Sequence, residues 1–135
     1  MKETAEQTAL NTVTLQVTAY QALISQIDEW NRTVLDPEIA ALALSLDDPN
    51  GDWSRLSDVD QSRARSLLYL LIRHADMAFY QYERGMLPEE RLESALVPFL
   101  FTISSPMGRA HWESAKANFV PAFRAYVDMQ LAPNE

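Results

Sequence analysis

The sequence of 135 residues contains no cysteine and only three glycines, and each scarcity excludes a class of structure. Without cysteine there is no disulfide, no thiolate nucleophile and no cysteine-ligated zinc or iron–sulfur centre. So few glycines disfavour a turn-rich all-β fold and a glycine-rich phosphate-binding loop. Long hydrophobic runs are also missing. The longest, residues 67–72 and 97–103, are far shorter than the roughly 20 residues that a membrane-spanning helix needs.

Basic residues are scarce as well. Lys and Arg number 11 against 19 Asp and Glu, which gives a formal net charge of −8. Such an acidic chain repels phosphate backbones and anionic lipid, so we expect no nucleic-acid partner. The first residues, MKETAE, lack the apolar core of a signal peptide, and we therefore expect a cytoplasmic location.

Apolar segments of helical period are present, separated by residues that start or stop helices. Small polar residues cap a helix start, proline is accepted in the first turn, and glycine follows the last turn. These signals are Asp36-Pro37, Ser57, Gly85, Leu87-Pro88, Ser105-Pro106 and Val120-Pro121. They predict an all-α fold, in which residues 1–135 form a single-domain bundle of about five to six helices.

The domain is predicted to have three parts: a long N-terminal helix (1–35), the remainder of the bundle (36–131) and a loose tail (132–135). From Ser62 to Tyr82 the chain is apolar on nearly every side, which predicts a central helix. Pro98 should kink the helix that follows, because its ring clashes with the carbonyl of Ser94.

Six apolar residues of the N-terminal helix are spaced 3, 4, 3, 4 and 3 apart, as in a heptad seam: Leu10, Val13, Val17, Tyr20, Ile24 and Ile27. An exposed row of this size would be a sticky patch, so we expect it to be buried. It packs either on the rest of the bundle or against a second copy of the chain. In the second case these six residues are the interface of a homodimer.

The known metal and catalytic motifs are missing from the sequence. A carboxylate-bridged di-iron bundle needs Glu-x-x-His motifs, but Leu71 and Gly108 stand three residues before His74 and His111. Neither histidine has a second one four residues away, as a zinc protease requires. We therefore interpret the chain as non-enzymatic, with no catalytic residue, no metal and no cofactor.

Three segments in the second half share a pattern with a group of other proteins. Residues 79–85 read FYQYERG, residues 105–112 read SPMGRAHW, and residues 119–124 read FVPAFR. Over residues 55–130 the chain resembles a group of uncharacterised small bacterial all-helical proteins. Many members of that group carry an N-terminal membrane tether, which this sequence does not show. The resemblance implies a helical fold and a bacterial source, and it implies no activity.

Two functions remain open at this point. The first is a protein that acts through contacts with a protein partner, or through homo-oligomerisation, using its N-terminal helix. The alternative is a small-molecule sensor or binding protein, in which His74, Tyr80, Arg109 and Trp112 line a pocket for an anionic or planar ligand. For Trp112 taken alone, the expected role is an anchor in the core.

Overall fold

A computed structural model describes residues 4–133 of the chain. These residues form six α-helices and two short 3-10 helices, and they contain no strand: α1 (Ala5–Thr33), α2 (Pro37–Asp47), η1 (Trp53–Arg55), α3 (Asp58–Glu83), α4 (Glu89–Ile103), α5 (Pro106–Ala115), η2 (Lys116–Asn118) and α6 (Pro121–Leu131). The all-α fold and the long N-terminal helix are therefore confirmed. Residues 132–133 follow α6 without helical structure, and the rest of the expected loose tail lies outside the described residues.

Side-chain caps open four of the six described α-helices. In each, an oxygen of the residue before the helix accepts a hydrogen bond from a first-turn N–H that would otherwise have no partner. The capping residues are Thr4, Asp36, Ser57 and Ser105. Helices α4 and α6 instead begin after Pro88 and Val120, whose side chains make no capping bond. The predicted helix starts at Asp36-Pro37, Ser57, Leu87-Pro88, Ser105-Pro106 and Val120-Pro121 are confirmed. Helix α1 begins at Ala5, and residues 1–3 of the predicted N-terminal helix lie outside the described residues.

The turn between α3 and α4 and the proline inside α4 follow from local backbone rules. Gly85 adopts a φ of 74°, in the left-handed region where a Cβ is unfavourable. Helix α4 continues through Pro98 from Glu89 to Ile103, so the proline does not end the helix. Proline has no N–H to donate to the carbonyl of Ser94, four residues earlier. Because Pro98 is exposed, water has access to this part of the helix.

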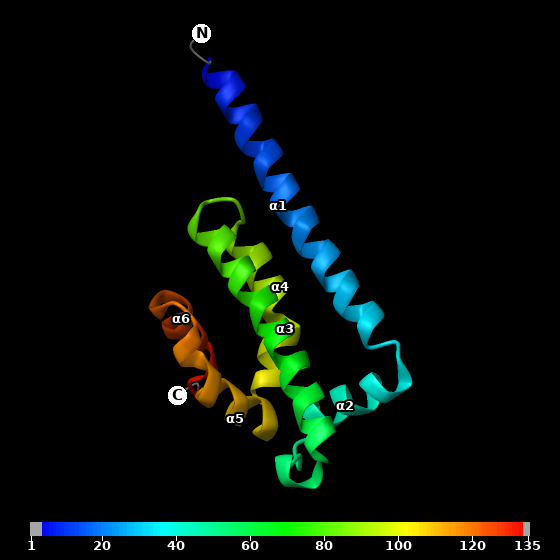
Figure 1. Ribbon diagram of the computed structural model, residues 1–135. Helices are drawn as coiled ribbons and strands as arrows, with labels where there is room; N and C mark the ends of the chain where they lie inside the picture. Colours follow the sequence, from blue (N-terminus) through cyan, green and yellow to red (C-terminus); the bar gives the residue numbers. More distant parts are fainter. Residues whose placement is uncertain (1–3, 134–135) are drawn as a thin grey trace.

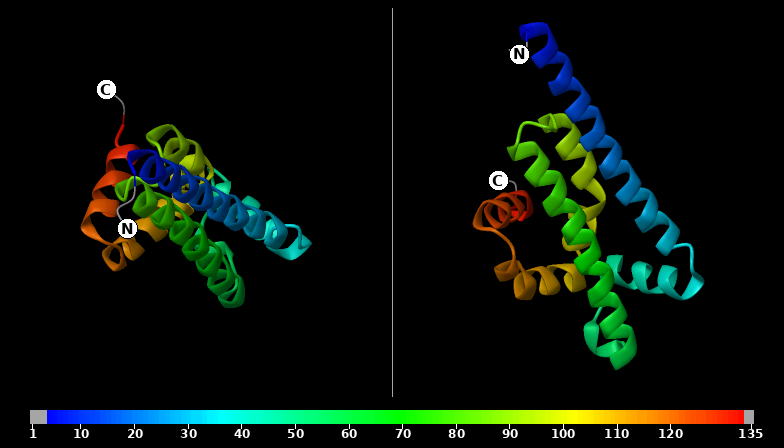
Figure 2. Two further views of the ribbon diagram at one scale, coloured as in Figure 1. Left: turned by 90° about the horizontal axis from the view of Figure 1, so that it is seen from above. Right: turned by 45° about the horizontal axis from the view of Figure 1, so that its top comes forward.

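The helices α3 and α4 form a pair, and other helices pack on both sides of this pair. Helices α3 and α4 pack on each other, and α1 lies along them on one side (Figure 1). Helix α6 lies on the opposite side, and α2 runs across one end of the bundle against α3, α4 and α5 (Figure 2). The N-terminal part of α1 extends well beyond the turn between α3 and α4 in these views.

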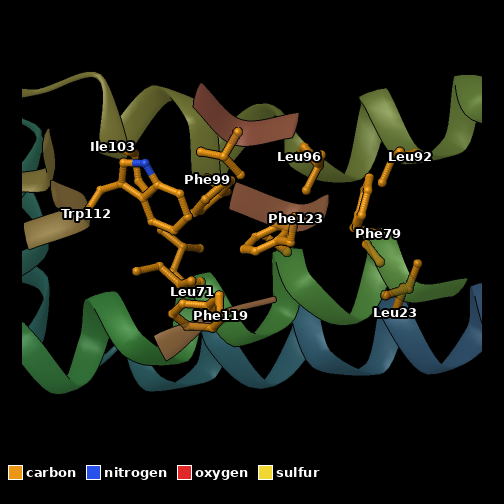
Figure 3. Packing of buried hydrophobic residues seen from close by; sticks show 14 of the residues in the cluster. Leu23, Leu71, Phe79, Leu92, Leu96, Phe99, Ile103, Trp112, Phe119 and Phe123 are labelled. Atoms are coloured by element: carbon orange, nitrogen blue, oxygen red, sulfur yellow. The ribbon is translucent and has the colours of Figure 1, made fainter. Parts of the chain in front are cut away.

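The main core lies between α3, α4, α5 and α6, and it is rich in aromatic rings (Figure 3). The rings of Trp112 and Phe123 meet edge to face with centroids 5.8 Å apart, and Phe99 and Phe119 pack around them. Trp112 is fully buried, which confirms its expected place in the core. A smaller apolar cluster joins α2, α3 and α5. No helix in residues 4–133 is long and apolar enough to cross a membrane.

Candidate functional site

The face of α1 that meets the bundle differs from the predicted seam. Leu23 is 3% exposed and is the most deeply buried side chain among the described residues of α1. On either side of it, Tyr20, Ile27 and Trp30 are half-buried and pack towards α3 and α4. The heptad period is therefore right, but its phase is shifted. Tyr20 and Ile27 belong to both stripes, and Leu23 replaces Ile24 as the buried residue.

The other four residues of the predicted seam form an exposed stripe along α1, which we call the outer stripe: Leu10, Val13, Val17 and Ile24. Their exposed fractions are 59%, 54%, 51% and 40%. At about 100° per residue they lie on one face of the helix, roughly a quarter-turn away from Leu23. These four residues are not buried within the bundle, because the helix turns Leu23 inward instead. The alternative, that they pack against a second copy of the chain, stays a prediction.

The N-terminal part of α1 has little support from the rest of the chain. All residues from Thr4 to Leu15 are exposed. Gln16 donates a hydrogen bond from Nε2 to the carbonyl of Gly85, at 3.3 Å, and so ties α1 to the turn between α3 and α4. Tyr20 follows one turn later, with the guanidinium of Arg91 over its ring at 4.8 Å. Val13 and Val17 line a groove beside Leu87 and Pro88, just before α4. The N-terminal part of α1 extends beyond that turn (Figure 1).

The surface of this helix is less polar than its composition suggests. No charged residue occurs between Glu6 and Asp28. The hydroxyls of Thr12, Thr14 and Thr18 donate hydrogen bonds to carbonyls one turn earlier in the same helix. Threonines bonded in this way present mainly their methyl groups to the surroundings. The sequence signal for this weakly polar surface is the absence of charged residues from 7 to 27. The spacing of the large apolar residues alone does not indicate it.

The predicted ligand-binding residues lie in several different surroundings. Trp112 is inside the core, where its indole N–H donates a hydrogen bond to Oδ1 of Asp128 at 2.9 Å. Arg109 lies on the surface of α5 and pairs with Glu113, at 3.3 Å from Nε to Oε1. Each of these two side chains therefore already has a polar partner within the protein: Asp128 for Trp112 and Glu113 for Arg109.

The other two predicted ligand-binding residues lie on α3. Tyr80 is 56% exposed, and the guanidinium of Arg84 lies 5.7 Å from its ring centre. His74 is half-buried beside α1 and lines a cavity. Burial lowers the pKa of His74, and the charge of Glu29 partly opposes this. A single pocket shared by these four residues stays a prediction.

A second histidine has a more crowded environment that sequence spacing did not reveal. His111 is 5% exposed, and its ring lies edge to face with Tyr69 at 4.9 Å. Trp53 lies 6.3 Å away and carries the guanidinium of Arg65 over its ring. Burial lowers the pKa of His111, and Arg65 adds to this effect. The histidine is thus held neutral by residues more than 40 positions away, a proximity that no local motif encodes.

The described residues include no group of three or more His, Cys, Asp or Glu side chains placed to hold a metal ion. Comparisons with protein families, with curated proteins and with solved structures find no match to this chain.

Proposed function

We propose that this protein is non-enzymatic and acts by self-association through α1, with the outer stripe as its contact surface. The observation that carries the proposal is the row of Leu10, Val13, Val17 and Ile24, exposed on a helix that projects from its own bundle. A single exposed leucine is ordinary, but an aligned row over four turns is typical of a helix that packs against another helix.

The charge distribution along α1 permits a second copy of the chain as the partner. The net charge of −8 makes two copies repel each other over most surfaces. Residues 7–27 carry no charge, so two α1 helices can approach without that cost. These 21 residues span about 31 Å of helix. A small stable interface buries about 1,200 Å², so the dimer also needs contacts from the adjoining parts of the bundle.

The rest of the chain serves in this proposal as the base that holds α1. We infer that α3 is the central helix of that base. In support, α3 packs against α1, α2, α4 and α5, and its buried residues include Leu68 and Ile72, which are fully enclosed. A bacterial source, a relation to small helical proteins of that kind and a cytoplasmic location belong to the same proposal, and they rest on sequence patterns.

The test is the mass in solution of the double variant Val17→Asp with Ile24→Asp. The parent chain should sediment as a dimer at micromolar concentration, and the double variant as a monomer, because each dimer would bury four new carboxylates in an apolar contact. The matched control is Leu15→Asp, since Leu15 is 53% exposed on α1 but lies off the outer stripe.

The control variant should keep the mass of the parent. A parent chain that stays monomeric at all concentrations would overturn self-association and leave a different protein as the partner of α1. A double variant with the mass of the parent would show that another surface holds the two copies together.

A further inference from the structure

A cavity of about 110 Å³ lies between α1, α3 and α4, at the place where α1 joins the bundle. Its walls are mostly apolar, and they include the rings of Trp30 and Phe99. Well-packed interiors contain few voids larger than a water molecule. A hollow of this size that is lined by aromatic and aliphatic groups is therefore a candidate binding site.

The cavity exists because three small side chains face it where larger ones would fill the space. They are Ala75 and Ala78 on α3 and Ala95 on α4. Ala75 and Ala78 are 3% and 1% exposed, so these positions belong to the interior of the bundle. Leucine at either of them would occupy most of the hollow, so the opening depends on the identity of single residues.

Three polar side chains also line the same cavity. They are Gln26, Asn31 and His74. Among the described residues, Oε1 of Gln26 is buried and has no hydrogen-bond partner. On the other side of this amide, Nε2 donates to the thioether of Met77, which is a weak acceptor. The amide is therefore held loosely, and its oxygen has an unmet capacity to accept.

The charge of the lining favours a neutral ligand. His74 is held in its neutral form near neutral pH, because burial lowers its pKa below the ordinary value of 6.5. The remaining lining residues are uncharged. An anion or a cation would enter this cavity without a countercharge, which is costly in an apolar site.

We propose that this cavity binds a small neutral molecule that consists of one aromatic ring and one hydroxyl or N–H donor. The ring would lie against the alanines between Trp30 and Phe99, and the donor would bond to Oε1 of Gln26. At about 110 Å³ the hollow is smaller than the apolar cavity of about 150 Å³ that holds one benzene molecule, so a ring enters only if the surrounding side chains shift slightly. This site is separate from the outer stripe, and it does not depend on self-association.

The experiment compares phenol with toluene, which has the same shape but no donor. Each is titrated into the ¹⁵N-labelled full chain, and the backbone amide shifts of α1, α3 and α4 are followed by NMR. Phenol should give saturable shifts around the cavity. Toluene should bind about five-fold more weakly, as expected for the loss of one hydrogen bond.

Two variants separate the ring from the donor. Ala78→Leu should abolish binding of both probes, because the leucine fills the cavity. Gln26→Leu should weaken phenol to the affinity of toluene and leave toluene itself nearly unchanged. Ala125→Leu, on the exposed face of α6, is the matched control and should bind both probes like the parent.

Three results would overturn the proposal. They are a parent chain with no saturable shifts at millimolar phenol, equal affinities for the two probes in the parent, or phenol binding that survives Gln26→Leu. Should the Ala78→Leu chain not fold, as judged by its circular dichroism, the Gln26→Leu comparison still decides between these outcomes, since the Gln26 side chain is half-buried and near the surface.

Discussion

The indole N–H of Trp112 donates a hydrogen bond to Oδ1 of Asp128 at 2.9 Å, and this bond joins α5 to α6. The other carboxylate oxygen of Asp128 lies 3.3 Å from Nζ of Lys116. Because the hydrogen bond from Trp112 and the ammonium of Lys116 both favour the ionised form, the pKa of Asp128 is lowered. The carboxylate of Asp128 thus accepts the hydrogen bond of a fully buried indole and also pairs with Lys116 near the surface.

Replacing Asp128 by alanine should destabilise the chain by about 1–2 kcal/mol, because the buried indole N–H of Trp112 then loses its acceptor. Asp128→Asn keeps an acceptor oxygen and should lose less. Lys116→Met removes the ion pairs of this lysine with Asp128 and with Glu113 near the surface, and we expect it to change the stability little. Urea unfolding of the three variants and the parent measures these differences. An equal loss for Asp128→Ala and Lys116→Met would show that the ion pair matters more than the indole bond.

The orientation of α1 predicts a difference between two leucines on the same helix. Leu23→Ala should cost about 2–5 kcal/mol, because it leaves a cavity in the interior. Leu15→Ala makes the same chemical change at a site that is 53% exposed and should cost less than about 0.5 kcal/mol. Thermal unfolding at one fixed protein concentration compares them. If the two variants had the same melting temperature, α1 would face the bundle in a different orientation.

Two glycines should respond differently to alanine. At Gly108 an added Cβ would collide with the backbone carbonyl of Thr102, at the corner where α5 follows α4. At Gly85 a Cβ meets nothing within 4 Å, and the cost comes from the positive φ alone. Gly85→Ala should therefore cost about 1–2 kcal/mol, and Gly108→Ala should cost more. Urea unfolding measures both. A tolerated alanine at residue 108 would contradict the close approach of α5 to α4.

The buried histidine predicts how stability depends on pH. The pKa of His111 is lowered in the folded chain, so between that value and the ordinary 6.5 the unfolded chain binds more protons. Stability should therefore fall as the pH drops through this range. The melting temperature should decrease from about pH 7.5 to about pH 5.5, and less steeply in His111→Leu. His74, whose pKa is also lowered, contributes to the slope that remains in the variant. Parallel slopes in the parent and the variant would contradict this role for His111.

The sequence determined where most of the α-helices begin. Ser57 and Ser105 cap a helix through their own side chains, and Gly85 takes a backbone conformation that few other residues tolerate. These effects act within a few residues of one another, so they can be predicted without knowing the fold. The burial of Trp112 could also be predicted, because a short helix offers no other side chain of that apolar area.

The tertiary structure decided how the helices face one another. The heptad period of α1 was visible in the sequence, but several phases are compatible with it, and the contact of Leu23 with residues of α3 and α4 selected one. The same holds for the neighbours of His111 and for the cavity beside His74, whose walls come from three helices. Contacts of this kind depend on packing between segments distant in sequence, where shape and volume choose among arrangements that local propensity leaves nearly equal.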